Sequence, residues 1–142
     1  MILLGLGVDP DTDVAGTVDW PIFVDVEPDS PDNVLVVSDT TWQGDGRTQP
    51  DGETLWHYGV QVKVRASGHP DGWAKARQVQ ATLDQQVAQN LVPIAAAVTG
   101  TAATYVVHSI SKTGILVVGQ AVATTKRHVF TLNPVIAITQ LS

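Results

Sequence analysis

The twelve residues Leu55–Ala66, "LWHYGVQVKVRA", carry the most regular pattern in the sequence. Apolar or small side chains occupy every second position from Trp56 to Ala66, and mostly polar or charged ones, including Lys63 and Arg65, lie between them. A period of two sends alternate side chains to opposite faces, so the pattern predicts a half-buried strand. At about 3.4 Å per residue the strand would be roughly 40 Å long. That is longer than most strands, so we expect it to project with the segment before it as a hairpin or loop.

Shorter elements are predicted on both sides of this strand. Residues 20–26 have a proline near their start and then β-forming side chains, which favours a short edge strand, and residues 33–39 form a second strand. Residues 40–54 contain three glycines and one proline, so a long polar loop is expected there. Further strands are predicted at 104–110, 115–118 and 127–138, with "SKTG" as the hairpin turn between the first two.

One helix is predicted at about residues 71–90, with Asp71 as its N-cap. Its apolar positions recur at steps of three and four: Trp73, Ala76, Val79, Leu83, Val87 and Leu91. The predicted fold class is therefore α+β, with a mixed, mostly antiparallel sheet and this helix packed on one face.

The chain length of 142 residues predicts a single domain, in which the aperiodic, acidic residues 1–19 form a loop or arm. No apolar run approaches the roughly 20 residues of a membrane span, so no membrane partner is expected. The net charge of −6 argues against a reader of nucleic-acid grooves.

Charge is distributed unevenly along the chain. Residues 1–53 hold 12 of the 14 acids and one base, a balance of −11, whereas residues 54–142 hold two acids and seven bases, a balance of +5. The two halves could be solvated loops, or the acidic half of one copy could meet the basic half of the next. The second interpretation predicts a subunit interface that joins bases Lys63, Arg65, Lys126 and Arg127 to acids Asp25, Asp29, Asp32 and Asp39.

Motifs for chemistry are weak. Asp9, Asp11 and Asp13 resemble the start of a calcium loop, but Val14 replaces the glycine that such a loop needs. "SISK" and "KTG" resemble two boxes of serine acylases, yet they share one lysine. The four histidines are scattered and the chain has no cysteine. We therefore predict no metal, no cofactor and no catalytic residue, so the protein is not expected to be an enzyme.

Several segments, in this order, resemble the tail terminator family of long-tailed bacteriophages, also called minor capsid or tail completion proteins. They are "PDSPDNVLVVSDT" (28–40), "VQVKVRA" (60–66), the helix with Ala74, Ala76 and Leu83, "YVVHSI" (105–110) and "KRHVFTLN" (126–133). The resemblance covers roughly residues 20–138, and it rests on the order and spacing of several weak motifs.

The resemblance implies a structural virion protein that resides in the tail or neck and, during assembly, in the host cytoplasm. Tail terminators form a ring, usually of six subunits, that caps the head-proximal end of the tail tube. The ring stops tube polymerisation and joins the head–tail connector, so the expected partners are further copies of the chain, the tube protein and the connector. Trp42 and Arg47, residue types enriched at interfaces, are the expected contact to a tail partner, with a solvated loop as the alternative interpretation of their segment.

Two alternatives stay open. Another neck or connector protein of the same virion would share the ring but would not arrest the growth of purified tube protein. An enzyme or a small-ligand domain would need a concave polar pocket, for which His108 or the strand face of His57 and Arg65 are the best candidates. A monomer with such a pocket would favour this last class.

Overall fold

The computed structural model describes residues 6–7, 20–47, 54–85, 90–94, 103–111, 114–120 and 126–141. The described elements are β1 (Ile22–Val24), β2 (Val34–Arg47), β3 (Thr54–Ala66), α1 (His69–Gln85), β4 (Asn90–Ile94), β5 (Ala103–Ile110), β6 (Leu116–Gln120), β7 (His128–Leu132) and β8 (Val135–Leu141). All eight strands belong to one mixed sheet. The α+β class, with a mixed sheet and a helix, is therefore confirmed.

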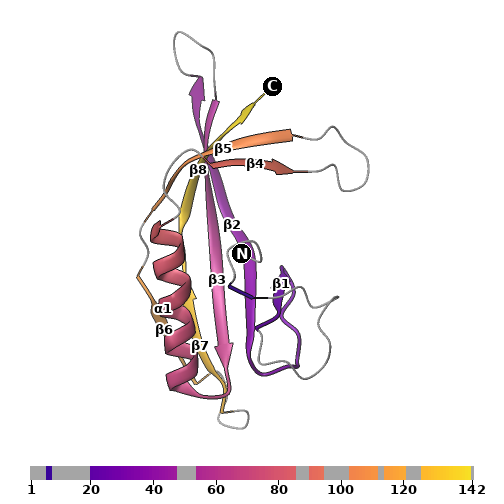
Figure 1. Cartoon of the computed structure of the whole chain (residues 1–142), viewed down its shortest axis with the longest axis vertical. Helices are drawn as coiled ribbons and strands as arrows, with labels where there is room; N and C mark the ends of the chain where they lie inside the picture. Colours follow the sequence, from indigo (N-terminus) through magenta and orange to yellow (C-terminus); the bar gives the residue numbers. More distant parts are fainter. Residues whose placement is uncertain are drawn as a thin grey trace.

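The long strand β3 organises this sheet (Figure 1). One side of β3 pairs with β2, from Val34 opposite Arg65 to Arg47 opposite Thr54. Its other side pairs with β7 at one end and with β8 at the other. The strand order is therefore β1-β2-β3-β7-β6 at one end of the molecule and β2-β3-β8-β5-β4 at the other. Every described pair is antiparallel except β1 with β2.

The change of neighbours occurs at Asn133–Pro134, between β7 and β8. A proline has no N–H to donate, so the ladder is interrupted there, although the carbonyl of Pro134 still accepts from the Val60 N–H at 3.0 Å. Beside the break, Ser111 accepts a hydrogen bond from the Val135 N–H through its Oγ and donates its own N–H to the Val135 carbonyl, both at 2.8 Å. The single strand predicted at 127–138 is therefore two strands.

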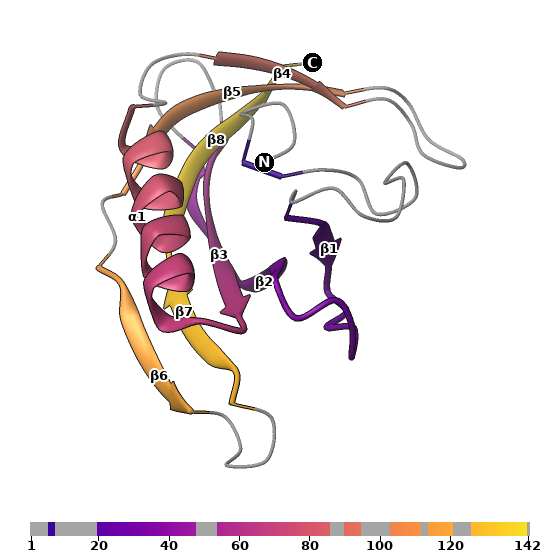
Figure 2. The same cartoon turned by 60° about the horizontal axis from the view of Figure 1, so that its bottom comes forward.

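Helix α1 lies along β3 and β7 on one face of the sheet (Figure 2). Of the predicted helical stripe, Ala76, Val79 and Leu83 are buried in the core, as expected from the period, whereas Trp73 is 41% exposed. The sheet contributes mainly Leu35 from β2, Val62 and Val64 from β3, and Phe130 and Leu132 from β7. Leu6, in the segment predicted as a loop or arm, is also fully buried in this core. The rest of that segment, apart from Gly7, lies outside the described residues.

The predicted N-cap and C-terminal limit of the helix were wrong. The helix begins at His69, and a hydrogen bond of 3.1 Å from the Gly72 N–H to the Gly68 carbonyl closes its first turn. Asp71 therefore lies inside the first turn instead of capping it, where its charge still opposes the positive end of the helix dipole. Asn90 begins strand β4, although Leu91 continues the helical spacing. Pairing with β5 determines the structure of this segment and outweighs the local pattern.

The polar loop predicted at 40–54 was also wrong over 40–47, where β2 continues alongside β3. The backbone of β3 offers partners over its whole length, so pairing outweighs the low strand propensity of this segment. Register shifts between Asp39 and Thr41 and between Gly44 and Arg47 accommodate the irregular residues. Figure 1 shows the far ends of β2 and β3 extending beyond β5, so the projecting part is a hairpin of two strands.

The predicted "SKTG" hairpin between 104–110 and 115–118 was wrong as well. Strand β5 pairs with β4 and β8, whereas β6 pairs with β7. The two strands separate because the break at Asn133–Pro134 lies between their partners, β8 and β7.

Candidate functional site

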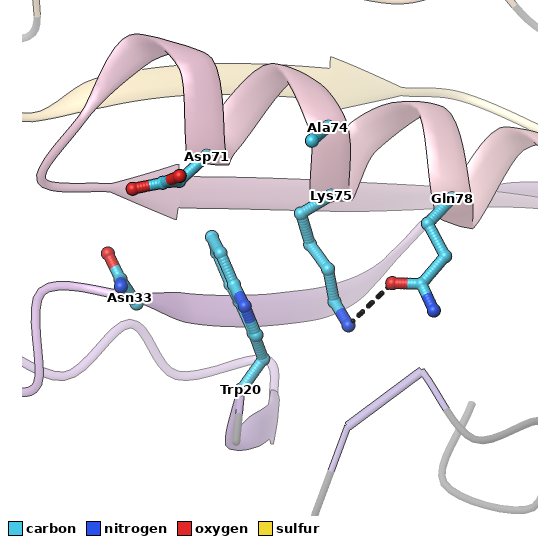
Figure 3. Close-up of a pocket in the computed structure, with 6 residues that line it drawn as sticks. All are labelled: Trp20, Asn33, Asp71, Ala74, Lys75 and Gln78. Atoms are coloured by element: carbon cyan, nitrogen blue, oxygen red, sulfur yellow. Dashed lines mark hydrogen bonds between the residues drawn. The ribbon is translucent and has the colours of Figure 1, made fainter. Parts of the chain in front are cut away.

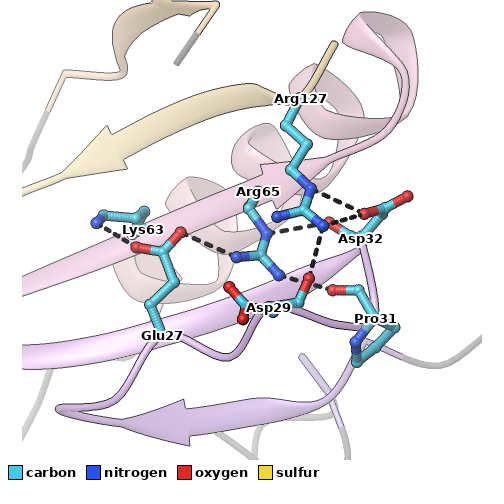
Figure 4. A network of polar contacts seen from close by, with 7 residues as sticks. All are labelled: Glu27, Asp29, Pro31, Asp32, Lys63, Arg65 and Arg127. Atoms are coloured by element: carbon cyan, nitrogen blue, oxygen red, sulfur yellow. Dashed lines mark hydrogen bonds and ion pairs between the residues drawn. The ribbon is translucent and has the colours of Figure 1, made fainter. Parts of the chain in front are cut away.

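A cluster of charged side chains lies on the face of the sheet opposite α1 (Figure 4). At its centre is Arg65 of β3, which is only 4% exposed. Its Nη1 lies 3.1 Å from Oε1 of Glu27, and its Nη2 donates to the Pro31 carbonyl at 2.8 Å. Lys63, two positions earlier on the same face, donates to Oε2 of Glu27 at 2.7 Å. One carboxylate therefore bridges two cations of β3.

The acidic segment, residues 25–32, brings these acceptors to the sheet. The chain leaves β1 at Asp25, whose φ is 58° and whose N–H donates to the Val37 carbonyl of β2 at 3.0 Å. Pro28 and Pro31 cannot donate to a ladder, so the segment does not extend β1 as a strand. Its carbonyls instead accept hydrogen bonds from the guanidinium groups of Arg65 and Arg127. The Pro-Asp pairs therefore fold the acidic segment back over the basic face.

The Glu27 carboxyl responds to two opposing influences. Partial burial raises its pKa, but the hydrogen bonds and positive charges of Lys63 and Arg65 together outweigh burial. The pKa of Glu27 therefore lies below its usual value of 4.5. Glu27 is consequently ionised at neutral pH, where it neutralises the buried guanidinium.

A second cation fixes the far end of the acidic segment. Arg127, just before β7, donates from Nε to Oδ1 of Asp32 at 2.8 Å and from Nη2 to the Asp29 carbonyl at 2.6 Å. The Asp32 side chain is 53% exposed, so this ion pair is more screened by water than the pair formed by Arg65. The acidic segment is therefore held at Glu27 and again at 29–32.

The charge partners predicted across a subunit interface thus meet inside one chain. Lys63, Arg65 and Arg127 contact the acidic segment of their own chain, and sequence analysis missed Glu27, the acid that joins two of them. The other predicted interface residues are exposed at the described surface: Asp25, Asp39 and Lys126. A role of any of these residues between subunits stays a prediction.

Trp42 and Arg47, the predicted contact to a tail partner, lie on β2 opposite Tyr58 and Thr54 of β3. Arg47 therefore lies at the projecting end of the hairpin, whereas Trp42 lies where β3 is still paired with β8. The placement of their side chains lies outside what the structure describes, and their role stays a prediction.

A hollow of about 520 Å³ lies between the N-terminal half of α1 and the start of β1 (Figure 3). Its lining residues are Trp20, Asn33, Asp71, Ala74, Lys75 and Gln78. Lys75 Nζ lies 5.6 Å from the centroid of the Trp20 ring and donates to Oε1 of Gln78 at 2.9 Å. The lysine thus contacts the walls of the hollow itself, and none of the histidines proposed for a ligand site lines it.

The histidines do not form a common site in the described part of the chain. His57 and Arg65 share a face of β3, but they are eight residues apart, which is about 27 Å along a strand. His108 Nε2 forms a hydrogen bond of 2.9 Å with Thr139 Oγ1. His69 packs edge-on against His128 and Phe130. No group of three or more metal-binding side chains occurs among the described residues.

Exposed apolar side chains gather at two strands that end the same row of the sheet. We call Val24, together with Val26 just beyond the strand, the β1 edge, and Leu116, Val117 and Val118 the β6 edge. The β1 edge is 63–68% exposed and the β6 edge 50–59% exposed. Together they supply five of the seven large apolar side chains that are exposed in the described part of the molecule.

A strand at the end of a sheet that carries exposed apolar side chains is a characteristic site for pairing with another chain. Sequence analysis identified both strands but did not identify them as interaction surfaces. The uncharged run "ILVV" at 115–118 was the available signal.

Comparison of the sequence with protein-family models finds no match, and comparison with curated proteins finds no relative. Among the described residues, no helix has the length and apolar character required to cross a membrane.

Proposed function

We propose that the protein is a structural subunit of a phage virion that assembles into a ring at the head-proximal end of the tail tube. The ring ends tube polymerisation and presents its other side to the head–tail connector. The order of motifs in the sequence supports this assignment through its resemblance to tail terminators. The proposal requires surfaces that bind other proteins and requires no catalytic group.

The observation that carries the proposal is the pair of apolar edges. A strand that ends a sheet and carries exposed apolar side chains invites association with another chain. Here Val24 of β1 and Leu116, Val117 and Val118 of β6 are exposed at the two ends of one five-strand row, and Val26 is exposed just beyond β1. Two different patches of one subunit can join copies head to tail, and such contacts generate a ring when the rotation closes.

The hairpin of β2 and β3 supports the second half of the proposal. It extends beyond the strands that surround it (Figure 1), and its β2 strand carries Trp42 and Arg47. A projecting hairpin on each subunit would form a crown on one side of the ring. We expect this crown to contact the tube or the connector.

Removal of the gene from an infecting phage tests the function. Heads should still form, while tails should be over-long or unjoined, and replacement of Trp42 and Arg47 by alanine should reproduce part of the defect. In a separate assay, the purified protein should arrest the polymerisation of purified tube protein. A failure to arrest, together with normal tail lengths and unjoined heads, would favour a neck connector instead. Normal tail length and normal joining without the protein would refute the proposal.

A further inference from the structure

We propose that the β6 edge of one copy pairs, as an antiparallel strand, with the β1 edge of the next copy, so that one sheet continues from subunit to subunit. This inference rests on the proposed ring for its biological role. Its physical basis is the direction, the facing and the chemistry of the two edge strands, which are independent of the virus.

The strand directions make the two edges compatible. Strand β1 runs parallel to β2, β2 is antiparallel to β3, β3 to β7, and β7 to β6. Within one chain, therefore, β6 runs opposite to β1. If a neighbouring copy repeats side by side in the same orientation, its β1 meets β6 in the antiparallel direction, which is the slightly more stable pairing.

The side chains also match across this junction. Val24 pairs with Val37 of β2, and Val117 pairs with Phe130 of β7. Phe130 is buried in the core beneath α1 and Val37 packs against the same core, so Val24 and Val117 lie on the α1 face of the sheet. Pairing of the two edges would place these valines beside each other, and would place Leu116 or Val118 near Phe23 on the opposite face. Neither described strand carries a charge that such pairing would bury.

The alternative occupant of the β6 edge is the β6 strand of a second copy. That contact would be symmetric and would stop at two copies, with both β1 edges left exposed. Pairing of β6 with β1 covers both edges of every subunit. A ladder that involves the three residues of β1 is short, so association of the isolated protein is expected to be weak and a covalent trap is the suitable test.

Cysteine cross-linking provides that trap, because the chain has no cysteine of its own. We would prepare Val24→Cys, Val117→Cys and the double variant, and treat each with a bismaleimide that reaches roughly 8 Å, the span of diagonal cross-strand neighbours. In one chain the two positions are separated by four strand spacings, about 19 Å, which is beyond this reach. The double variant should give a ladder of covalent oligomers that ends at the number of copies in the ring. Each single variant should stay monomeric.

In the matched control the second cysteine is placed on α1, at the exposed position Ala81, instead of on β6. The Val24→Cys/Ala81→Cys variant has the same number of thiols and should give no ladder. Circular dichroism of each variant checks that the fold is retained. The pairing would be overturned if the Val24→Cys/Val117→Cys variant stayed monomeric, or if its ladder were no stronger than that of the control. A covalent dimer from Val117→Cys alone would overturn it in favour of β6 pairing with β6.

Charge reversal gives a second test without cross-linking. Val117→Lys should weaken self-association about tenfold, because a lysine on an edge strand opposes pairing. Adding Val24→Glu to the same chain should restore association, since the two side chains share a face. No weakening in the single variant, or no recovery in the double variant, would overturn the pairing. If rings form on tails but the double variant gives no cross-linked ladder, only this contact is refuted. If the ladder forms but tails are normal after removal of the gene, only the proposed function is refuted.

Discussion

Replacement of Glu27 by glutamine should destabilise the fold, although the residue is on the surface and was not among the predicted site residues. The change keeps the size and the acceptor oxygen of the side chain but removes its charge. Arg65, 4% exposed, would then keep its contacts with the carbonyls of Pro31 and Asp32 and lose its only charged partner among the described residues. Lys63 would lose the same partner.

The magnitude follows from the burial of the groups. A hydrogen bond to a charged group contributes about 1.5–3 kcal/mol, and loss of one partner from a fully buried ion pair costs about 3–5 kcal/mol. The Glu27 side chain is 35% exposed, so water screens its interactions and the upper values do not apply. We expect a loss of about 1.5 kcal/mol in the free energy of unfolding at neutral pH. For a chain of 142 residues the melting temperature should fall by about 5 °C.

The pH dependence separates this explanation from a general loss of packing. The pKa of Glu27 is lowered in the folded state, so its ionised form stabilises the protein above the unfolded pKa, near 4.5. This contribution is lost as the pH falls through the lower, folded-state pKa. Urea denaturation should therefore show a difference in the free energy of unfolding between the wild type and Glu27→Gln at about pH 7. This difference should narrow progressively below about pH 4.5.

Asp39→Asn is the matched control, because it removes one negative charge from an exposed position on β2. Its stability should stay within about 0.5 kcal/mol of the wild type. Equal stability of Glu27→Gln and wild type at neutral pH would contradict the role of the bridging carboxylate. A gap of constant size down to about pH 3 would show that the effect does not depend on the charge of Glu27.

Urea denaturation of three further variants tests the packing between α1 and the sheet and the ion pair of Arg127 with Asp32. Gly72→Val should cost about 2–3 kcal/mol, because a Cβ at this position would lie 2.5 Å from Phe130 Cε2 and 2.9 Å from the Ala66 Cβ. Gly68→Ala, whose added Cβ would have its nearest neighbour at 3.4 Å, should cost less than about 1 kcal/mol, through the change of N-cap residue alone. Equal effects of the two changes would contradict this contact. Phe130→Ala should cost about 3–5 kcal/mol by opening a cavity beneath α1, and a loss under about 1 kcal/mol would show that the core there collapses or is loosely packed. Arg127→Gln should cost less than about 1 kcal/mol, and the loss should shrink in high salt, because its partner Asp32 is largely exposed.

The sequence predicted the central strand β3 well because its side chains alternate simply between the two faces of the sheet. Residues 55–66 present apolar side chains to the helix on one face, so a period of two reports their burial directly. The stripe at Ala76, Val79 and Leu83 likewise reports contact with the sheet. Where pairing with a distant strand decides the structure, as at 40–47 and 90–94, the local pattern was misleading.

The charge cluster shows a different limit. The separation of acids from bases predicted that two oppositely charged surfaces would meet. Charge counts are the same whether the meeting occurs between two copies or within one chain, so composition cannot distinguish the two cases. The path of the acidic segment decides it, and that path depends on the turn at Asp25 and on the prolines at 28 and 31.

The break at Asn133–Pro134 connects the fold to the proposed assembly. Without it, β7 and β8 would form one strand beside β3, and a single neighbour could cover its outer side along the whole length. Because the ladder is interrupted, β6 covers only the β7 end, and β5 and β4 cover the other. The five-strand row therefore ends in the short β6, and its apolar side chains remain exposed at the end of the molecule where β1 lies across the sheet. The hairpin of β2 and β3 extends at the opposite end (Figure 1). A subunit built in this way can use one end of its sheet to join its neighbours while the hairpin at the other end contacts a different partner.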